Sequence, residues 1–144
     1  EEDDDQPDPL ELRLAGLVSA EAGGAGGEVR EGLAALLADE RLDEIAVKVK
    51  EKALYKLARL YAEARMFDEV QALLQTNQLL LNAVPKAKTA KMVRTVVDVL
   101  GGVEGSMDVQ VALCHEVVAW CKREKRTFLR QRIESKLSAL LLRQ

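Results

Sequence analysis

The stretch Glu44–Tyr61, EIAVKVKEKALYKLARLY, decides the fold class of this 144-residue chain. Its apolar side chains recur at helical spacing and form one continuous stripe, made of Ile45, Val49, Ala53, Leu54, Leu57, Ala58 and Tyr61. Asp43 precedes the stripe, where its carboxylate can cap the helix, although Ala46 stands at the third position in place of the ideal glutamate. We therefore predict an amphipathic helix that begins after Asp43 and ends near Arg65.

Leu57, Ala58 and Tyr61 form a trio of a large apolar, a small and an aromatic residue. In tetratricopeptide repeats, such a trio lets the first helix of a pair accept the second closely. Degenerate copies follow at offsets of 39 and 41 residues, namely Val96-Val97-Leu100 and Leu137-Ser138-Leu141. This period predicts an all-α fold, an α-solenoid of antiparallel helix pairs that forms a TPR-like or HEAT-like superhelix.

The remaining apolar residues predict further helices on both sides of this stripe. Before it, a short helix over residues 10–18 ends before Gly23, and a second helix spans residues 29–37. After it, we expect a helix opened by Asp68, one opened by Pro85 and stopped by Gly101-Gly102, one capped by Ser106 or Asp108, and a last one capped by Thr127. Their expected buried residues include Leu79, Leu80, Ala87, Val97, Leu113, Cys114, Leu129 and Leu137.

Two domains follow from composition. Residues 1–27 are acidic at the start and carry the run AGGAGG at 22–27, so we predict a flexible segment with a short helix. Residues 28–144 form the helical-repeat domain. Its last helix, which ends in SALLLRQ, lacks a second helix to pair with, so we expect the domain to be truncated at its C-terminal end.

The overall composition suits a helical protein in a reducing compartment. Aromatic residues make up only 3% of the chain, and residues 10–84 contain no proline. The net charge of −3 is more than accounted for by the acidic run Glu1–Asp5. The acidic start and the lack of a long apolar run predict a protein with no membrane association. Cys114 and Cys121 are too far apart along one helix to form a disulfide, so we expect two buried free thiols.

No catalytic constellation emerges. His115, the one histidine, adjoins Cys114, but adjacent helical residues point about 100° apart and do not form a thiol–imidazole pair. The acidic pairs at residues 43–44 and 68–69 suit helix starts, and the glycine clusters lack a phosphate-loop lysine. We predict that the chain is not an enzyme and has no cofactor, no metal and no small-molecule substrate.

Basic residues form two clusters at the starts of two repeats. The first contains Lys86, Lys88, Lys91 and Arg94, and the second contains Lys122, Arg123, Lys125, Arg126, Arg130 and Arg132. Because alternate helices of a solenoid begin along one edge, the two clusters predict a basic ridge that binds a protein partner. The alternative is a solvated surface, and nucleic acid is disfavoured by the scarcity of aromatic residues. Trp120 and Phe128 flank the second cluster and are predicted to pack between repeats.

Two segments of the chain carry a family resemblance. Glu124–Gln131, EKRTFLRQ, and Pro85–Leu100, PKAKTAKMVRTVVDVL, resemble the 26S proteasome non-ATPase regulatory subunit 11 family, over about residues 45–144. The resemblance implies the N-terminal helical-repeat arm of a non-enzymatic scaffold in the regulatory lid, a family whose members also carry a C-terminal PCI domain. It implies lid, ATPase-base and 20S α-ring subunits as partners, a role in ubiquitin-dependent degradation, and a cytoplasmic and nuclear location.

Two alternatives remain open from the sequence. The signalosome scaffold subunit shares the same layout of helical repeats and a PCI domain. A TPR-type adaptor would bind a peptide tail through a carboxylate clamp, to which Asn77, Asn82 and Lys86 bear a loose likeness.

Overall fold

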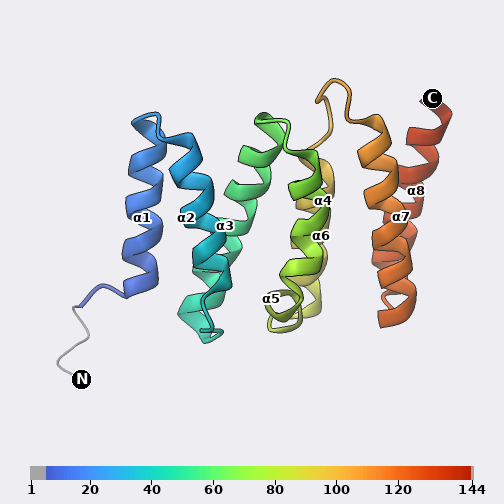
Figure 1. The fold of residues 1–144 in the computed structure, drawn as a ribbon. Helices are drawn as coiled ribbons and strands as arrows, with labels where there is room; N and C mark the ends of the chain where they lie inside the picture. The colour runs from blue at the N-terminus through green and yellow to red at the C-terminus, as the bar shows by residue number, and fades with distance from the viewer. Residues whose placement is uncertain (1–5, 144) are drawn as a thin grey trace.

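Residues 6–143 of the chain are described by a computed structural model. Over these residues the fold consists of eight helices and no strand: α1 (Pro9–Ala22), α2 (Gly26–Ala38), α3 (Glu44–Glu63), α4 (Phe67–Thr76), α5 (Gln78–Asn82), α6 (Lys86–Asp98), α7 (Met107–Glu124) and α8 (Thr127–Arg143). They stand side by side in a row from α1 to α8 (Figure 1). The all-α repeat fold predicted from the sequence is confirmed.

Short connections between successive helices make most neighbours antiparallel. In Figure 1, α3, α6 and α8 each begin at the edge drawn at the bottom, and α2, α5 and α7 end there. We call this the lower edge. One continuous apolar core runs along the row from Leu10 on α1 to Leu140 on α8. Most helices pack mainly on their sequence neighbours, whereas α6 packs mainly on α3, the first helix of the preceding repeat.

The first two repeat trios lie in this core. Leu57, Ala58 and Tyr61 are buried on α3, and α6 buries Val97 with Leu100 just beyond its end, as close packing of helix pairs requires. The third trio differs, because Leu137 is buried whereas Ser138 and Leu141 are exposed. These two residues lie on the face of α8 that no described helix covers.

The N-terminal segment contains more regular structure than its composition predicts. The short helix expected at residues 10–18 is longer and forms α1, whose Leu10 is buried against the core. Gly26 and Gly27 form the first turn of α2, so the predicted linker is reduced to a turn over residues 23–25. The part of the flexibility prediction that falls on residues 1–5 lies outside the described residues, and for residues 22–27 it stays a prediction.

A polar cluster joins α1 to the loop between α2 and α3. Asp43 caps α3 as predicted, because its carboxylate accepts a hydrogen bond of 3.4 Å from the N–H of Ala46. The guanidinium of Arg41 donates to Asp8 at 2.8 and 2.9 Å and to Asp43 at 2.8 and 2.9 Å. Lys50 is only 1% exposed, and its ammonium donates to the carbonyl oxygens of Asp39 and Arg41. These bonds satisfy backbone groups that the loop would otherwise leave unpaired.

Several predicted positions are wrong in detail. Leu79 is 76% exposed because the chain breaks at Asn77 and restarts as α5, which turns Leu80 and Leu81 inward instead. Ala87 and Ile45 are also exposed, since each lies in the first turn of its helix, off the face that meets the core.

Two of the predicted caps do not form. Thr127 is the first residue of α8 and not its cap. Ser106 occupies the capping position of α7, but its hydroxyl donates to the carbonyl oxygens of Leu100 and Val103. The hydroxyl therefore closes the preceding loop instead of capping the helix.

Candidate functional site

The first basic cluster starts at the lower edge, and its members farther along α6 contact α3. Lys86 is exposed at the start of α6, whereas Lys88 forms an ion pair of 3.2 Å with Glu51 on α3. The ammonium of Lys91 lies 5.9 Å from the centre of the Tyr55 ring, and Arg94 donates to the carbonyl oxygen of Ala90 within its own helix. The cluster is therefore partly engaged in joining α6 to α3.

Tyr55 and Glu51 are the residues on α3 that receive these cations. The hydroxyl of Tyr55 donates a hydrogen bond of 2.6 Å to Glu51 Oε2, the same oxygen that faces Lys88. Burial, and then the hydrogen bond to Glu51, raise the pKa of Tyr55, so its hydroxyl stays a donor across the physiological range. Sequence reasoning missed this network because its residues lie on two different helices.

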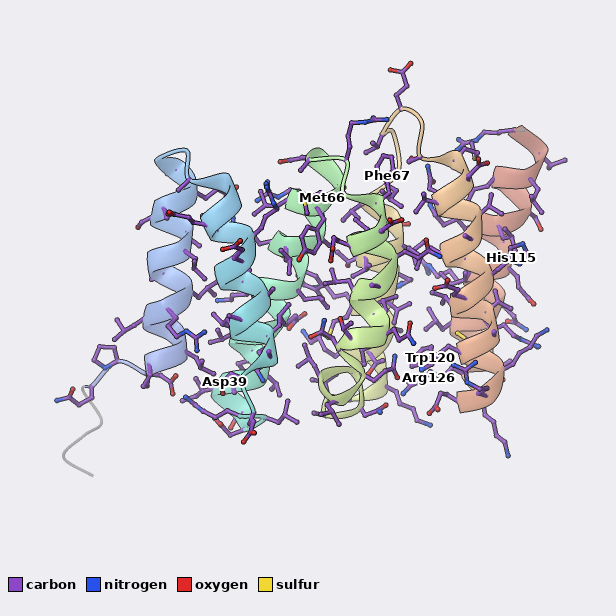
Figure 2. All side chains as sticks on the ribbon, viewed as in Figure 1. Asp39, Met66, Phe67, His115, Trp120 and Arg126 are labelled. Carbon is purple, nitrogen blue, oxygen red and sulfur yellow. The ribbon has the colours of Figure 1, made fainter. Side chains whose placement is uncertain are left out.

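The second basic cluster lies where α7 ends and α8 begins. Lys125 is exposed and adopts the left-handed conformation, with φ of 58°, that ends α7. The guanidinium carbon of Arg126 lies 4.9 Å from the centre of the Trp120 ring (Figure 2). The Nε atoms of Arg126 and Arg130 are buried and have no hydrogen-bond partner among residues 6–143. Cations at this place suit the negative end of the α7 dipole.

Both clusters start at the lower edge, but they do not form a uniform ridge. By helical rise, Arg94 lies about 12 Å farther along α6 than Lys86. Lys86 and Lys125 are exposed at this edge, and neither side chain forms an ion pair, a hydrogen bond or a cation–π contact within residues 6–143. These two residues are therefore available to a partner.

The two aromatic residues beside the second cluster behave differently. Trp120 is buried, and its indole N–H donates a hydrogen bond of 3.0 Å to Gln78 Oε1 on α5. Phe128 is 87% exposed, which corrects the prediction that it packs between repeats. The face of α8 that meets α7 is set by Leu129, Ile133, Leu137 and Leu140. Phe128 is rotated by about 100° from Leu129 and points away from this face.

A groove that sequence reasoning missed lies between α4–α5 and α7. Its volume is about 380 Å³, and its floor is formed by Leu74, Leu81, Val117 and Trp120. Gln71, Gln75 and Gln78 line one wall, and Glu116, Arg123 and Glu124 line the other. Gln71 Nε2 donates a hydrogen bond of 2.6 Å to Glu116 Oε2 across the groove. The spacing of the three glutamines in the sequence was a readable signal, but neither the break that places Gln78 on α5 nor the partner helix was readable.

The residues considered for catalysis are not brought together. His115 is exposed on α7 (Figure 2), whereas Cys114 and Cys121 are buried free thiols, as predicted. Burial raises the pKa of both thiols and keeps them protonated. No three of the His, Cys, Asp and Glu side chains in the described part of the chain are grouped so that they could hold a metal ion. Among residues 6–143, no helix has the length and apolar character needed to cross a bilayer.

The structure contradicts the loose likeness of Asn77, Asn82 and Lys86 to a carboxylate clamp. Asn77 is buried, and its amide donates to the carbonyl oxygen of Leu73 at 2.8 Å. It closes the end of α4 and is not presented to a ligand, whereas Asn82 and Lys86 are exposed.

Comparisons with known proteins agree on one family. Residues 22–144, which contain α2 to α8, match the family described as the 26S proteasome regulatory subunit RPN6 N-terminal domain. The 26S proteasome non-ATPase regulatory subunit 11 homolog of Arabidopsis thaliana is 39% identical over 107 residues, which cover 74% of this chain and 26% of the relative.

Two further relatives show the same pattern. A probable 26S proteasome regulatory subunit rpn6 of Schizosaccharomyces pombe is 37% identical over 68% of this chain and 23% of its own length. The 26S proteasome non-ATPase regulatory subunit 11 of Dictyostelium discoideum is 32% identical over 65% of this chain and 22% of its own length. The chain thus spans about a quarter of the length of these relatives.

Proposed function

Because the chain belongs to the family of 26S proteasome regulatory subunit RPN6 N-terminal domains, we propose that it is the N-terminal arm of a non-enzymatic scaffold subunit of the regulatory lid. The arm stabilises the association of the lid with the ATPase base and with the α-ring of the 20S core, and so serves ubiquitin-dependent protein degradation. Its location follows that of the assembly, in the cytoplasm and the nucleus.

The observation that carries this proposal is the family match over nearly the whole row of helices, from residue 22 to residue 144. The architecture supports a scaffold, because helices stacked in a row make a stiff body whose long edges can contact more than one neighbour (Figure 1). Proteasome subunits are named among the relatives, which favours this function over a signalosome scaffold or a TPR-type adaptor.

The lower edge is our proposed docking surface. Lys86 and Lys125 are available cations there, and other members of the two clusters, including Lys88, Lys91, Arg94, Arg126 and Arg130, add positive charge behind them. A partner with acidic patches would be steered to this edge by complementary charge. Contacts of this kind weaken as salt rises, because the Debye length falls to about 8 Å at physiological ionic strength.

The first test is co-purification of the natural full-length protein, followed by mass spectrometry of the associated subunits. Recovery of lid, base and 20S subunits is the expected outcome. Recovery of signalosome subunits alone would instead assign the protein to that complex. Recovery of neither complex would favour a TPR-type adaptor.

The second test is charge reversal at the lower edge of the full-length protein. Lys86→Glu combined with Lys125→Glu is expected to slow docking of the lid and to reduce its dependence on salt. Both side chains are exposed, so circular dichroism should show unchanged helicity. Lys52→Glu combined with Arg143→Glu, also at exposed positions, makes the same change in net charge and should leave docking intact. If both double variants assemble like the natural protein, the lower edge is merely solvated.

A further inference from the structure

Arg126 and Arg130 form a pair of arginines at the seam between α7 and α8. The N–H of Arg130 donates to the carbonyl oxygen of Arg126 at 3.0 Å, so the two residues are one helical turn apart. At this spacing their Cβ atoms lie about 5–6 Å from each other. Both residues are half-buried, and Arg126 lies over the ring of Trp120, which is itself hydrogen-bonded to Gln78 (Figure 2). Packing therefore restricts where the two guanidiniums can lie.

The pair has no counter-ion within the described chain. Neither guanidinium forms an ion pair or a side-chain hydrogen bond among residues 6–143, and the Nε atoms of both are buried. Glu124 and Glu134 are the carboxylates nearest to the pair in the sequence, and neither is bonded to it. Like charges that are half-buried side by side are unfavourable unless an anion offsets them. The pair is thus suited to an anion that comes from a partner.

The segment around the pair has a strong excess of positive charge. Residues 122–134 contain two carboxylates and six cations, so the excess is four positive charges; the cations besides the pair are Lys122, Arg123, Lys125 and Arg132. None of them takes part in an ion pair among residues 6–143. A partner group with a double negative charge is therefore favoured at this seam over a singly charged one.

A phosphate group suits the pair better than a carboxylate does. One arginine can occupy both oxygens of a carboxylate with two parallel hydrogen bonds, which leaves the second arginine without an acceptor. A phosphorylated serine or threonine carries a charge of about −1.5 to −2 at pH 7 and three acceptor oxygens, so two guanidiniums can share it. The donors for this contact are the terminal nitrogens of Arg126 and Arg130, which, unlike the Nε atoms, are not buried.

We propose that Arg126 and Arg130 together bind a phosphorylated serine or threonine of a partner protein. The two guanidiniums share the phosphate, and the exposed Lys125 beside them pairs with an acidic residue that flanks it. This inference rests on the proposed docking of the lower edge, whose cations it shares, and names the chemistry of the partner there. Phosphorylation of the partner would then strengthen docking at this edge.

Nucleic acid fits the pair less well than a phosphorylated protein segment does. Proteins that hold the phosphates of single strands also stack the neighbouring bases on aromatic rings. Trp120 is buried, and Arg126 lies over its ring. Phe128 is exposed, but it is rotated by about 160–200° around α8 from the two arginines. No aromatic ring of this seam can therefore stack a base next to a phosphate held by the pair.

The direct test measures the fluorescence anisotropy of a labelled peptide titrated with the natural full-length protein. The fluorescein-labelled peptide contains alanine, glycine, two aspartates and one central phosphoserine. We expect saturable binding that is at least about ten-fold tighter than that of the same peptide with serine or glutamate at its centre. Equal binding of the phosphoserine and glutamate peptides, or no saturable binding of the phosphoserine peptide, would overturn the proposal.

Matched variants localise the phosphate. Arg130→Gln should weaken the phosphoserine peptide at least about ten-fold, because one of the two guanidiniums is lost. Arg132→Gln makes the same change in charge at an exposed position of α8 and should have little effect. Circular dichroism checks that helicity is kept, and Arg126→Gln tests the other member of the pair if Arg130→Gln is not folded. Equal losses in Arg130→Gln and Arg132→Gln would reduce the effect to general charge and refute the site.

Separate readouts distinguish this inference from the proposed function. If Lys86→Glu with Lys125→Glu slows docking of the lid but the peptides bind without regard to phosphate, the docking surface stands and phosphate recognition is refuted. If the phosphoserine peptide binds as expected but that double variant docks normally, the pair binds phosphate and the lower edge is not the docking surface. Binding of a single-stranded oligothymidine with the same sensitivity to Arg130→Gln would assign the pair to nucleic acid instead.

Discussion

The indole nitrogen of Trp120 on α7 donates a hydrogen bond of 3.0 Å to the side-chain oxygen of Gln78 on α5. The two residues are 42 positions apart and belong to successive repeats. Arg126 lies over the same ring, so the end of α7 and the start of α8 are joined to the preceding repeat through one tryptophan.

Removing the acceptor of this bond should destabilise the protein. In Gln78→Met the shape is nearly kept, but the buried indole N–H loses its partner, which should lower the free energy of unfolding by about 1 kcal/mol. Urea unfolding monitored by circular dichroism measures the change. Gln75→Met is the matched control, because Gln75 is exposed on the same wall of the groove. Equal stabilities of the two variants would show that the bond contributes nothing.

The small residue of the first repeat trio should not tolerate enlargement. Ala58 is completely buried on α3, so Ala58→Trp is expected to force neighbouring helices apart and to cost about 1–3 kcal/mol. Thermal unfolding should show a lowered midpoint, whereas Ala139→Trp on the exposed face of α8 should not. An unchanged midpoint in Ala58→Trp would contradict close helix packing at the trio.

Two residues with a left-handed backbone conformation should differ in how replacement by glycine changes the stability of the protein. Arg65 and Lys125 both have φ of 58°, a conformation that costs an L-residue about 1 kcal/mol relative to glycine. Lys125→Gly should therefore stabilise the protein. Arg65 also donates to the carbonyl oxygen of Glu104 at 2.6 Å and lies 5.1 Å from the centre of the Phe67 ring. Arg65→Gly loses both contacts, so chemical denaturation should show it to be less stable than Lys125→Gly.

The polar cluster at α1 should make stability depend on acid pH. Hydrogen bonds from Arg41 are the largest cause that lowers the pKa of Asp8 and of Asp43. A depressed carboxyl pKa contributes stability that is present above the ordinary pKa, about 4, and is lost as pH falls through the depressed value. Arg41→Gln should therefore be less stable than the natural chain at about pH 7, and the difference should shrink toward about pH 3.

The midpoints of urea unfolding over this pH range measure the difference in stability between Arg41→Gln and the natural chain. Arg143→Gln, at an exposed position in the last turn of α8, is the control and should run parallel to the natural chain. If this difference in stability stays constant with pH, Arg41 stabilises the protein through packing alone.

Sequence was sufficient where the deciding interaction is local. The stripe from Val49 to Tyr61 fixes a helix because its period is that of the backbone itself. Asp43 caps α3 because its acceptor lies only three residues from the N–H of Ala46. The family, too, was readable, since EKRTFLRQ is a contiguous segment at one seam between two helices.

Only the tertiary structure decided which side chains remain available. Phe128 and Trp120 flank the same seam and looked equivalent in sequence, yet one is exposed and the other is buried against Gln78. Lys88 looked like a free member of the basic cluster and is paired with Glu51 on another helix. The physical reason is that periodicity gives the face of each helix, whereas the rotation and spacing between helices depend on contacts among residues far apart in the chain.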